Sequence, residues 1–193
     1  MEELPPAMLS ELKLKIVTDE IMEYSTMTSL NNLIVTLKNT SDKSLDQFKE
    51  VLLPLVDELI KLSGDFMLSF YKTDIINFIN KNPKVIVDTL IRRCYEEKDG
   101  LLRAKIVNGE ESFFLQNNFE DMTEGDNKLI NIIFKFKDFW GKLNNENKDI
   151  LKSYLLSVVA LCDVRYLSFK KFICLKSLNP KYETLFNQYI NIF

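Results

Sequence analysis

Histidine is absent from this chain of 193 residues. Its absence removes catalytic triads that use an imidazole, His-ligated zinc or haem, and the usual general base at neutral pH. The strings GxxxxGK[ST], GxGxxG and GxSxG are also missing, so there is no phosphate-cradling loop and no nucleophile elbow. The three cysteines are too few for a four-thiolate site. We therefore expect no enzymatic activity, small-molecule substrate, metal or cofactor, and the sequence offers no catalytic, cofactor-binding or metal-binding residue.

The sequence also lacks a secretory signal, a long apolar run and a lipidation box. The longest apolar run, Leu155–Cys162 with Ser157 inside it, is far shorter than the ~20 residues of a membrane span. The cysteines are widely spaced among apolar neighbours, which is typical of buried thiols in a reducing compartment. We expect a protein that is neither secreted nor transmembrane.

Charges of both signs are interspersed along the chain, with a net charge of -3 and a pI of about 5.2. This mild acidity argues against a protein that mainly neutralises phosphates. Two basic pairs, Arg92-Arg93 and Lys170-Lys171, lack interleaved aromatic residues, and we interpret them as solvated helix faces; nucleic-acid contact is the alternative. Four acidic pairs are also interpreted as solvated surface charge rather than as a magnesium or acid–base site: Asp19-Glu20, Glu96-Glu97, Glu110-Glu111 and Glu120-Asp121.

Glycine and proline are scarce, with five of each, and they separate segments in which apolar residues recur at steps of three and four. This periodicity predicts an all-α fold. We expect a single compact bundle of seven to nine helices over residues 1–193, or the same bundle with an appendage formed by residues 1–40. The expected helices are Ala7–Met22, Thr28–Lys38, Lys43–Leu62, Asp65–Asn80, Pro83–Lys98, Lys128–Leu143, Phe169–Leu178 and Pro180–Asn191. One more helix, which ends at Cys162, is expected to pair with Lys128–Leu143.

Two residues are expected to mark the ends of the helix over residues 43–62, and a third is expected to disturb it from within. Asp42 is the expected cap and Gly64 the expected stop. Pro54 lies within the apolar stripe, so we expect a kink near Glu50–Val51 or a break into two helices.

Residues 103–122 have the least regular pattern. Residues 104–107 fit a short strand, which a turn at Asn108-Gly109 would close into a hairpin. Alternatively, the chain opens a short helix after Gly109 that carries Phe113–Leu115. We favour the helix, because no convincing partner strand lies nearby.

The most informative segment is Asn127–Cys162, which predicts two amphipathic helices joined by a polar turn of about four residues. The apolar stripe of the first helix is Leu129, Ile132, Ile133, Phe136, Phe139, Trp140 and Leu143. The second is expected to bury Leu151, Tyr154, Leu155, Val158, Leu161 and Cys162. So short a turn forces the helices to lie antiparallel, and we expect this C-terminal hairpin to be the centre of the fold's stability, with Trp140 in its core.

An apolar helix that ends in Phe-Trp, a polar linker, and then Ile150–Leu155 (Ile-Leu-Lys-x-Tyr-Leu) resembles a family of lysine- and asparagine-rich helical proteins of nucleocytoplasmic large DNA viruses, of giant-virus or iridovirus type. Phe48–Leu62 and Gly109–Asn118 match the family's earlier segments more loosely. Leu151 departs from the tryptophan that the family often has before this lysine. The resemblance implies a viral protein in the virion or in the host cytoplasm, with no catalytic residue to carry over.

Protein–protein interaction with a viral or host partner is therefore the expected function, as a virion component or as an accessory factor. Two alternatives concern the residues around Trp140. The string FKDFWGKL is similar to a Trp-Gly motif of Bcl-2-like apoptosis regulators, which bind helices, although Lys142 replaces the arginine of that motif. Phe136, Phe139 and Trp140 with their flanking lysines would also suit an interfacial membrane helix, but we favour a hairpin core.

Overall fold

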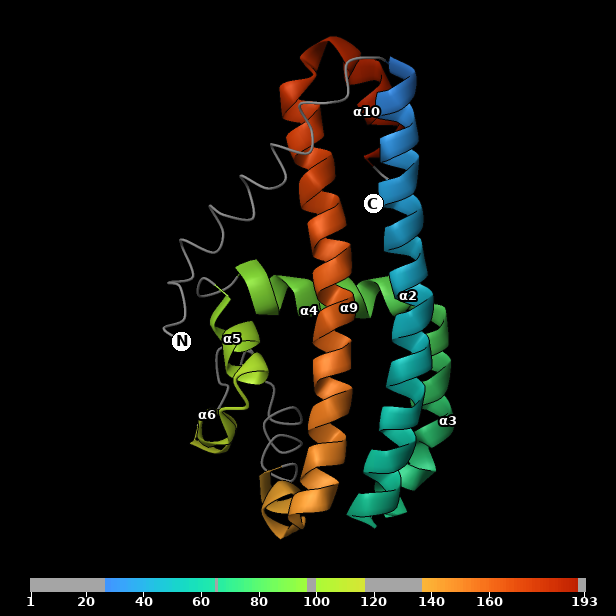
Figure 1. Ribbon diagram of the computed structural model, residues 1–193. Coiled ribbons are helices and arrows are strands. Elements are labelled where there is room, and N and C mark those ends of the chain that lie inside the picture. Colours follow the sequence, from blue (N-terminus) through green and yellow to red (C-terminus); the bar gives the residue numbers. More distant parts are fainter. Residues whose placement is uncertain (1–26, 65, 97–99, 117–136, 191–193) are drawn as a thin grey trace, which may run out of the picture.

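Two long antiparallel helices form the frame of the protein (Figure 1). The computed structural model describes residues 27–64, 66–96, 100–116 and 137–190, and within these ranges the regular structure is entirely helical. Helix α2 (Met27–Ser63) and helix α9 (Asn145–Leu178) lie side by side, each more than 50 Å long at ~1.5 Å per residue. The predicted all-α fold is confirmed.

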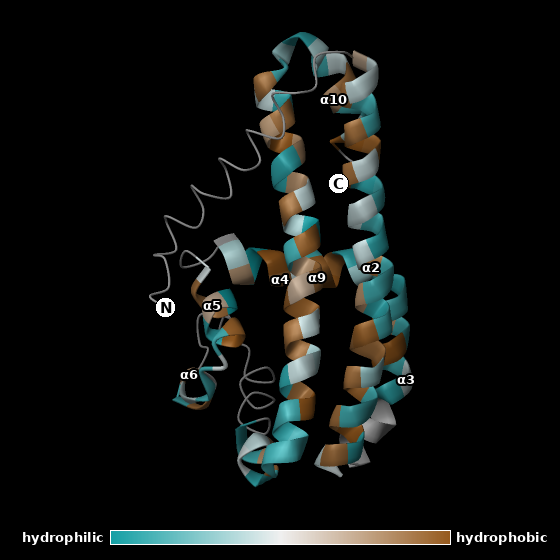
Figure 2. Cartoon of the chain, viewed as in Figure 1, coloured by the Kyte–Doolittle hydropathy of each residue, from teal (hydrophilic) through white to brown (hydrophobic). Residues whose placement is uncertain are grey.

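Shorter helices pack around this pair. Helix α3 (Phe66–Lys81) turns back along α2, and α4 (Pro83–Ile91) crosses the two long helices near their middle and continues into a π-helix, Arg92–Glu96. Figure 2 shows that α4 is hydrophobic along most of its length. Helices α5 (Leu101–Val107) and α6 (Glu111–Gln116) follow beside the lower half of α9. A 3-10 turn at Pro180–Tyr182 and helix α10 (Glu183–Tyr189) close the opposite end.

Three apolar clusters lie in succession along the α2–α9 pair. The upper cluster joins the start of α2, the end of α9 and α10, and Phe172 meets Phe186 edge to face at 5.5 Å between ring centroids. The middle cluster packs Phe48 of α2 and Val87 of α4 against Val158 and Cys162 of α9. The lower cluster consists of the buried residues Leu55, Trp140 and Leu151 with their half-buried neighbours. Burial of these side chains is the main stabilising contribution.

A polar layer separates the upper from the middle cluster. The guanidinium group of Arg165, only 3% exposed, donates through Nη1 to Ser41 Oγ at 2.7 Å and through Nε to Asp88 Oδ1 at 3.0 Å. The hydroxyls of Ser44 and Ser168, which are also buried, donate to carbonyl oxygens of their own helices. This polar layer connects α2, α4 and α9, and its hydrogen bonds offset the cost of removing an arginine from water.

The structure corrects two predicted helix breaks. Helix α2 runs without interruption through residues 38–43, where Asp42 was expected to cap a new helix and instead pairs with Lys38 within α2. Helix α9 likewise continues from Asn145 to Leu178, so no separate helix begins at Phe169. Both expected breaks coincide with residues of the polar layer. In a sequence pattern, polar residues inside a long helix cannot be distinguished from polar residues at a helix end.

Pro54 does not break α2, since the helix spans it and ends at Ser63, and Gly64 then adopts φ +59°. The predicted stop at Gly64 is confirmed. The predicted helices over residues 65–80 and from Pro83 are also present, and Pro83 occupies the first turn, where a missing N–H costs nothing. The predictions for Ala7–Met22 and for most of Lys128–Leu143 fall outside the described residues.

Candidate functional site

A cavity of about 130 Å³ lies between α5, α6, the helical residues 137–142 and the lower half of α9. Its lining consists of Ile106, Val107, Gly109, Glu111, Leu115, Lys137, Trp140, Lys152, Leu155 and Leu156. Three of these residues are large apolar side chains that remain open to solvent: Val107 at 46%, Leu115 at 39% and Leu156 at 43%. Exposed apolar groups that converge on one cavity are typical of binding sites. We call this cavity the Trp140 pocket.

The α5–α6 turn is shaped by Gly109, which has φ +65°. The N–H of Gly109 donates to the carbonyl of Ile106 at 3.1 Å, and the N–H of Glu110 donates to the carbonyl of Lys105 at 3.0 Å. These two bonds form a Schellman motif, which ends a helix and favours glycine at this position. The alternative prediction of a strand over residues 104–107 is therefore wrong, because Asn108-Gly109 terminates a helix here. The favoured prediction, a helix after Gly109, is confirmed as α6.

Helix α5 is fastened to α9 by a bidentate ion pair. Arg103 donates from Nε to Asp163 Oδ1 at 2.8 Å and from Nη2 to Asp163 Oδ2 at 2.6 Å. Such a fork fixes orientation as well as distance. This ion pair holds the α5 wall of the Trp140 pocket, including Val107, against its α9 floor.

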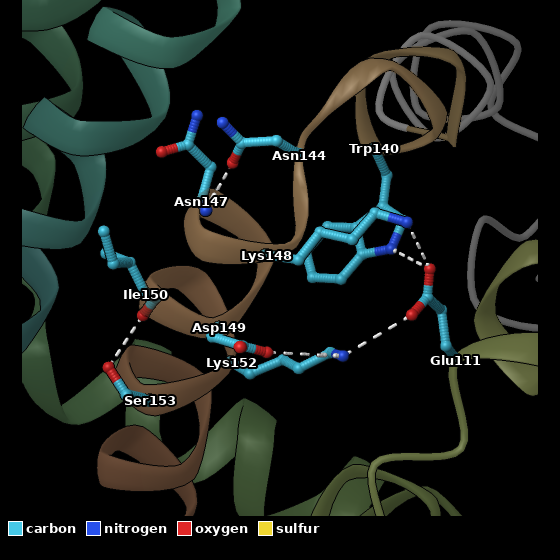
Figure 3. Close-up of polar contacts among 9 residues, drawn as sticks. All are labelled: Glu111, Trp140, Asn144, Asn147, Lys148, Asp149, Ile150, Lys152 and Ser153. Atoms are coloured by element: carbon cyan, nitrogen blue, oxygen red, sulfur yellow. Dashed lines mark hydrogen bonds and ion pairs between the residues drawn. The ribbon is translucent and has the colours of Figure 1, made fainter.

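Helix α6 is fastened to α9 by Glu111, at the edge of the Trp140 pocket (Figure 3). Its Oε1 accepts a hydrogen bond from Trp140 Nε1 and another from Lys148 Nζ, each at 2.7 Å. The Nζ of Lys152 lies farther away, 3.5 Å from Glu111 Oε2. The hydrogen bond from Lys148 and, after it, the one from the indole of Trp140 lower the pKa of Glu111 to about 2. We call Glu111, Trp140, Lys148 and Lys152 the Glu111 cluster.

Of the predicted hairpin, the structure describes the last helical residues of the first helix, 137–142, the connecting turn and the second helix, which is the start of α9. Asn144 caps α9, with its Oδ1 accepting from the N–H of Asn147 at 2.8 Å (Figure 3). Trp140 is 6% exposed and packs in the lower cluster with Leu151 and Tyr154 from α9. The core position expected for Trp140 is therefore present, and its indole also forms part of the pocket wall.

The solvated role expected for the pair Glu110-Glu111 is wrong for Glu111. Its side chain is 29% exposed and has three partners in the Glu111 cluster. A sequence signal for this contact did exist, because a buried tryptophan needs an acceptor for its N–H and Trp140 is the chain's only tryptophan. Nothing in the sequence singled out Glu111 as that acceptor, however.

The two basic pairs lie near a stack of tyrosine rings. Arg92 and Arg93 are in the π-helix and Lys170 and Lys171 on α9, and the rings of Tyr95 and Tyr166 stack at 4.3 Å between centroids. Lys170 lies over Tyr166 and Arg103 over Tyr95. Both rings are thus engaged by side chains of the protein itself, which disfavours them as a platform for nucleic-acid bases.

The thiols of Cys94 and Cys162 are buried and that of Cys174 is half-buried. Burial raises the pKa of Cys94 to about 11 and that of Cys162 to about 12, so these thiols are protonated at neutral pH and poorly reactive. Among the described residues, no group of three or more Cys, Asp or Glu side chains could hold a metal ion. None of the described helices combines the length and apolar character that crossing a membrane requires.

Comparisons of the chain with protein-family models, with curated proteins and with solved structures give no match. The resemblances to the viral family and to Bcl-2-like regulators therefore stay predictions. The strongest indication of function is the geometry around Trp140.

Proposed function

We propose that this chain is a non-enzymatic viral protein that acts by binding another protein through the Trp140 pocket, as a virion component or as an accessory factor in the infected cell. The viral assignment rests on the resemblance carried by residues 139–155. The binding role rests on one structural observation: Val107, Leu115 and Leu156 remain open to solvent around a single cavity. Exposed apolar residues gathered in this way mark interaction sites.

The walls of the Trp140 pocket are well fixed, which favours binding of a partner without large rearrangement. Arg103 and Asp163 hold α5, and Glu111 holds α6, each through charged hydrogen bonds of 2.6–2.8 Å to residues on other helices. A preorganised site loses less entropy when a partner binds.

The volume of the Trp140 pocket distinguishes this proposal from a Bcl-2-like groove. A groove for an amphipathic helix must take several apolar residues spaced along that helix. The present cavity, about 130 Å³, is similar in size to the ~150 Å³ cavity that holds one benzene molecule. It therefore suits a single side chain of a partner rather than the face of a helix.

Site-specific photo-crosslinking in cells infected with the source virus tests the proposal. A photoreactive amino acid at Leu156 is expected to give one discrete protein adduct, identifiable by mass spectrometry. The matched control is Val164, which is also exposed on α9 but does not line the pocket, and it should not give this adduct.

The identity of the adduct then separates the two roles. A viral structural protein, together with stoichiometric copies of the chain in purified virions, would indicate a virion component. A host protein would indicate an accessory factor. Equal labelling from Leu156 and Val164, or labelling of nucleic acid alone, would contradict the proposal.

A further inference from the structure

We infer that the Trp140 pocket recognises a peptide segment of the partner in which one large apolar residue is followed or preceded by an acidic residue. The apolar side chain fills the cavity and the carboxylate binds Lys152. The inference rests on the proposed function and specifies the chemistry of the partner.

The lining and the volume of the cavity determine the apolar residue of this motif. Its walls are Ile106, Val107, Leu115, Leu155 and Leu156, with the indole of Trp140 beside them. A volume of about 130 Å³ matches one ring or one branched aliphatic side chain. Filling it would also cover the apolar groups that are now exposed at its mouth, and this burial supplies most of the affinity.

The charges around the cavity determine the acidic residue of this motif. Among the described residues that line the cavity, Glu111 carries a carboxylate and Lys152 carries an ammonium group that lies near it. The carboxylate of Glu111 already has partners within the protein, because its Oε1 accepts hydrogen bonds from both Trp140 and Lys148 at 2.7 Å. Lys152 is left with contacts of 3.5 and 3.9 Å, so an acidic group on the partner would be attracted to its ammonium group and a basic group would be repelled.

Lys152 is the cation best placed to bind that carboxylate. Its Nζ lies 3.5 Å from Glu111 Oε2 and 3.9 Å from Asp149 Oδ1, and both distances exceed the ~2.7–2.9 Å of a charge-assisted hydrogen bond. The side chain of Lys152 is 36% exposed. Its ammonium group can thus donate a short bond to a partner without giving up a strong internal contact, whereas Lys148 is tightly bound to Glu111.

A peptide-display selection tests this motif. A random library of 12-residue peptides is selected on the wild-type chain and counter-selected on Leu156→Ser, whose substituted side chain is exposed enough for the fold to survive. The enriched peptides are expected to pair Leu, Ile, Met or Phe with an adjacent Asp or Glu. The same selection on Lys152→Glu is expected to lose the acidic preference.

Affinities can be read from the fluorescence of Trp140, the only tryptophan and part of the pocket wall. Lys152→Gln should weaken binding of an enriched peptide about three- to fivefold, as for a partly exposed ion pair. Leu156→Ser should weaken it by more than about tenfold, as for an interface anchor. The matched control is Lys142→Gln, which removes the same charge from an exposed lysine outside the pocket lining and should change nothing.

The outcomes separate this inference from the proposed function. Peptides with an apolar anchor but no acidic preference, bound equally by Lys152→Gln, would overturn the carboxylate inference and leave the pocket as a protein-binding site. Enriched peptides whose binding ignores Leu156→Ser would overturn both. Tighter binding of 3-phenylpropionate than of any selected peptide would make this a small-molecule site and would also overturn both.

Discussion

Two charged clusters in this protein contain similar groups and differ in what surrounds them. The polar layer places Arg165, Asp88 and Ser41 between two apolar clusters, where three helices cross. The Glu111 cluster places a carboxylate, an indole and two lysines at the edge of a cavity. In the first, the central charge is enclosed and hydrogen-bonded within the protein. In the second, one cation, Lys152, keeps only long contacts and faces the cavity.

The comparison shows how burial decides whether a charged group can exchange its partner. Leaving an enclosed charge without its partner is costly, so the polar layer specifies which parts of α2, α4 and α9 must meet. A charge at a cavity edge can exchange an internal contact for an external one at little cost, because water still reaches it. The same chemistry thus serves helix alignment in the polar layer and, in the function that we propose, recognition of a partner at the Glu111 cluster.

The largest effect is expected where the Glu111 cluster reaches the core. Trp140→Ala should lower the free energy of unfolding by about 3–5 kcal/mol, because it removes a buried aromatic side chain from the lower cluster. Chemical denaturation measures this change. Leu156→Ala, at a site 43% exposed, is the control and should cost less than about 1 kcal/mol. A similarly small loss for Trp140→Ala would assign Phe139–Lys142 to partner binding rather than to the core.

The polar layer should give the next largest effect. Arg165→Ala should cost about 3 kcal/mol, the lower end of the range for breaking a buried pair, because Asp88 is 48% exposed and stays hydrated. Arg165→Met keeps most of the volume and should recover at least about 1 kcal/mol of that loss. Equal unfolding free energies for the two variants would show that the charged hydrogen bonds, and not the packing, account for the whole effect.

The Glu111 cluster should make stability depend on pH. Glu111→Gln should cost about 1–2 kcal/mol at neutral pH, because it removes a charged acceptor of two hydrogen bonds. The folded-state pKa of Glu111, about 2, lies below the ordinary value of 4.5. Its stabilising contribution is therefore complete above pH 4.5 and declines as the pH falls towards 2.

Thermal melts of both proteins across this range measure the effect. The gap between the melting temperatures of the wild type and Glu111→Gln should narrow as the pH falls from 5 to 3. A constant gap would contradict the lowered pKa.

The smallest effect on stability is expected at Lys152. Lys152→Gln should change the free energy of unfolding by less than about 0.5 kcal/mol, because both of its ion pairs are long and partly exposed. Lys148→Gln should cost more, about 1 kcal/mol, because it removes a 2.7 Å bond from a side chain that is 18% exposed. If denaturation ranks the two variants in the reverse order, Lys152 is a structural residue and the proposed division between the two lysines fails.

Sequence periodicity predicted the helices but not their continuity. The apolar stripes of residues 43–62 and 145–162 were regular enough to give the helical class and the second helix of the predicted hairpin. The sequence nevertheless predicted a break in each long helix, at residues 38–43 in α2 and at residues 163–168 in α9. The polar side chains there, such as Ser41 and Arg165, resemble helix ends when they are read along one chain. Only the pairing of α2 with α9 shows that they satisfy one another.

The candidate site was less accessible to prediction from sequence. Trp140 was identified as a core residue, and its predicted position is confirmed. The pocket beside it depends on where α5 and α6 dock, and this is set by Glu111 and by Arg103, which lies 60 residues before its partner Asp163. A local pattern carries no information on such long-range ion pairs, so Glu111 was interpreted as solvated surface charge.

The pairing of α2 with α9 has a consequence for synthesis on the ribosome. The residues of α2 that it buries, including Leu30, Ile34 and Phe48, are covered largely by α9 and α10. More than a hundred residues must be translated after α2 before α9 is complete. At ~5–20 residues per second, this interval lasts roughly 5 to 20 s. During that time the apolar face of α2 lacks its native cover, so the nascent chain is a strong candidate for chaperone binding, and truncation before α9 should give an aggregating product.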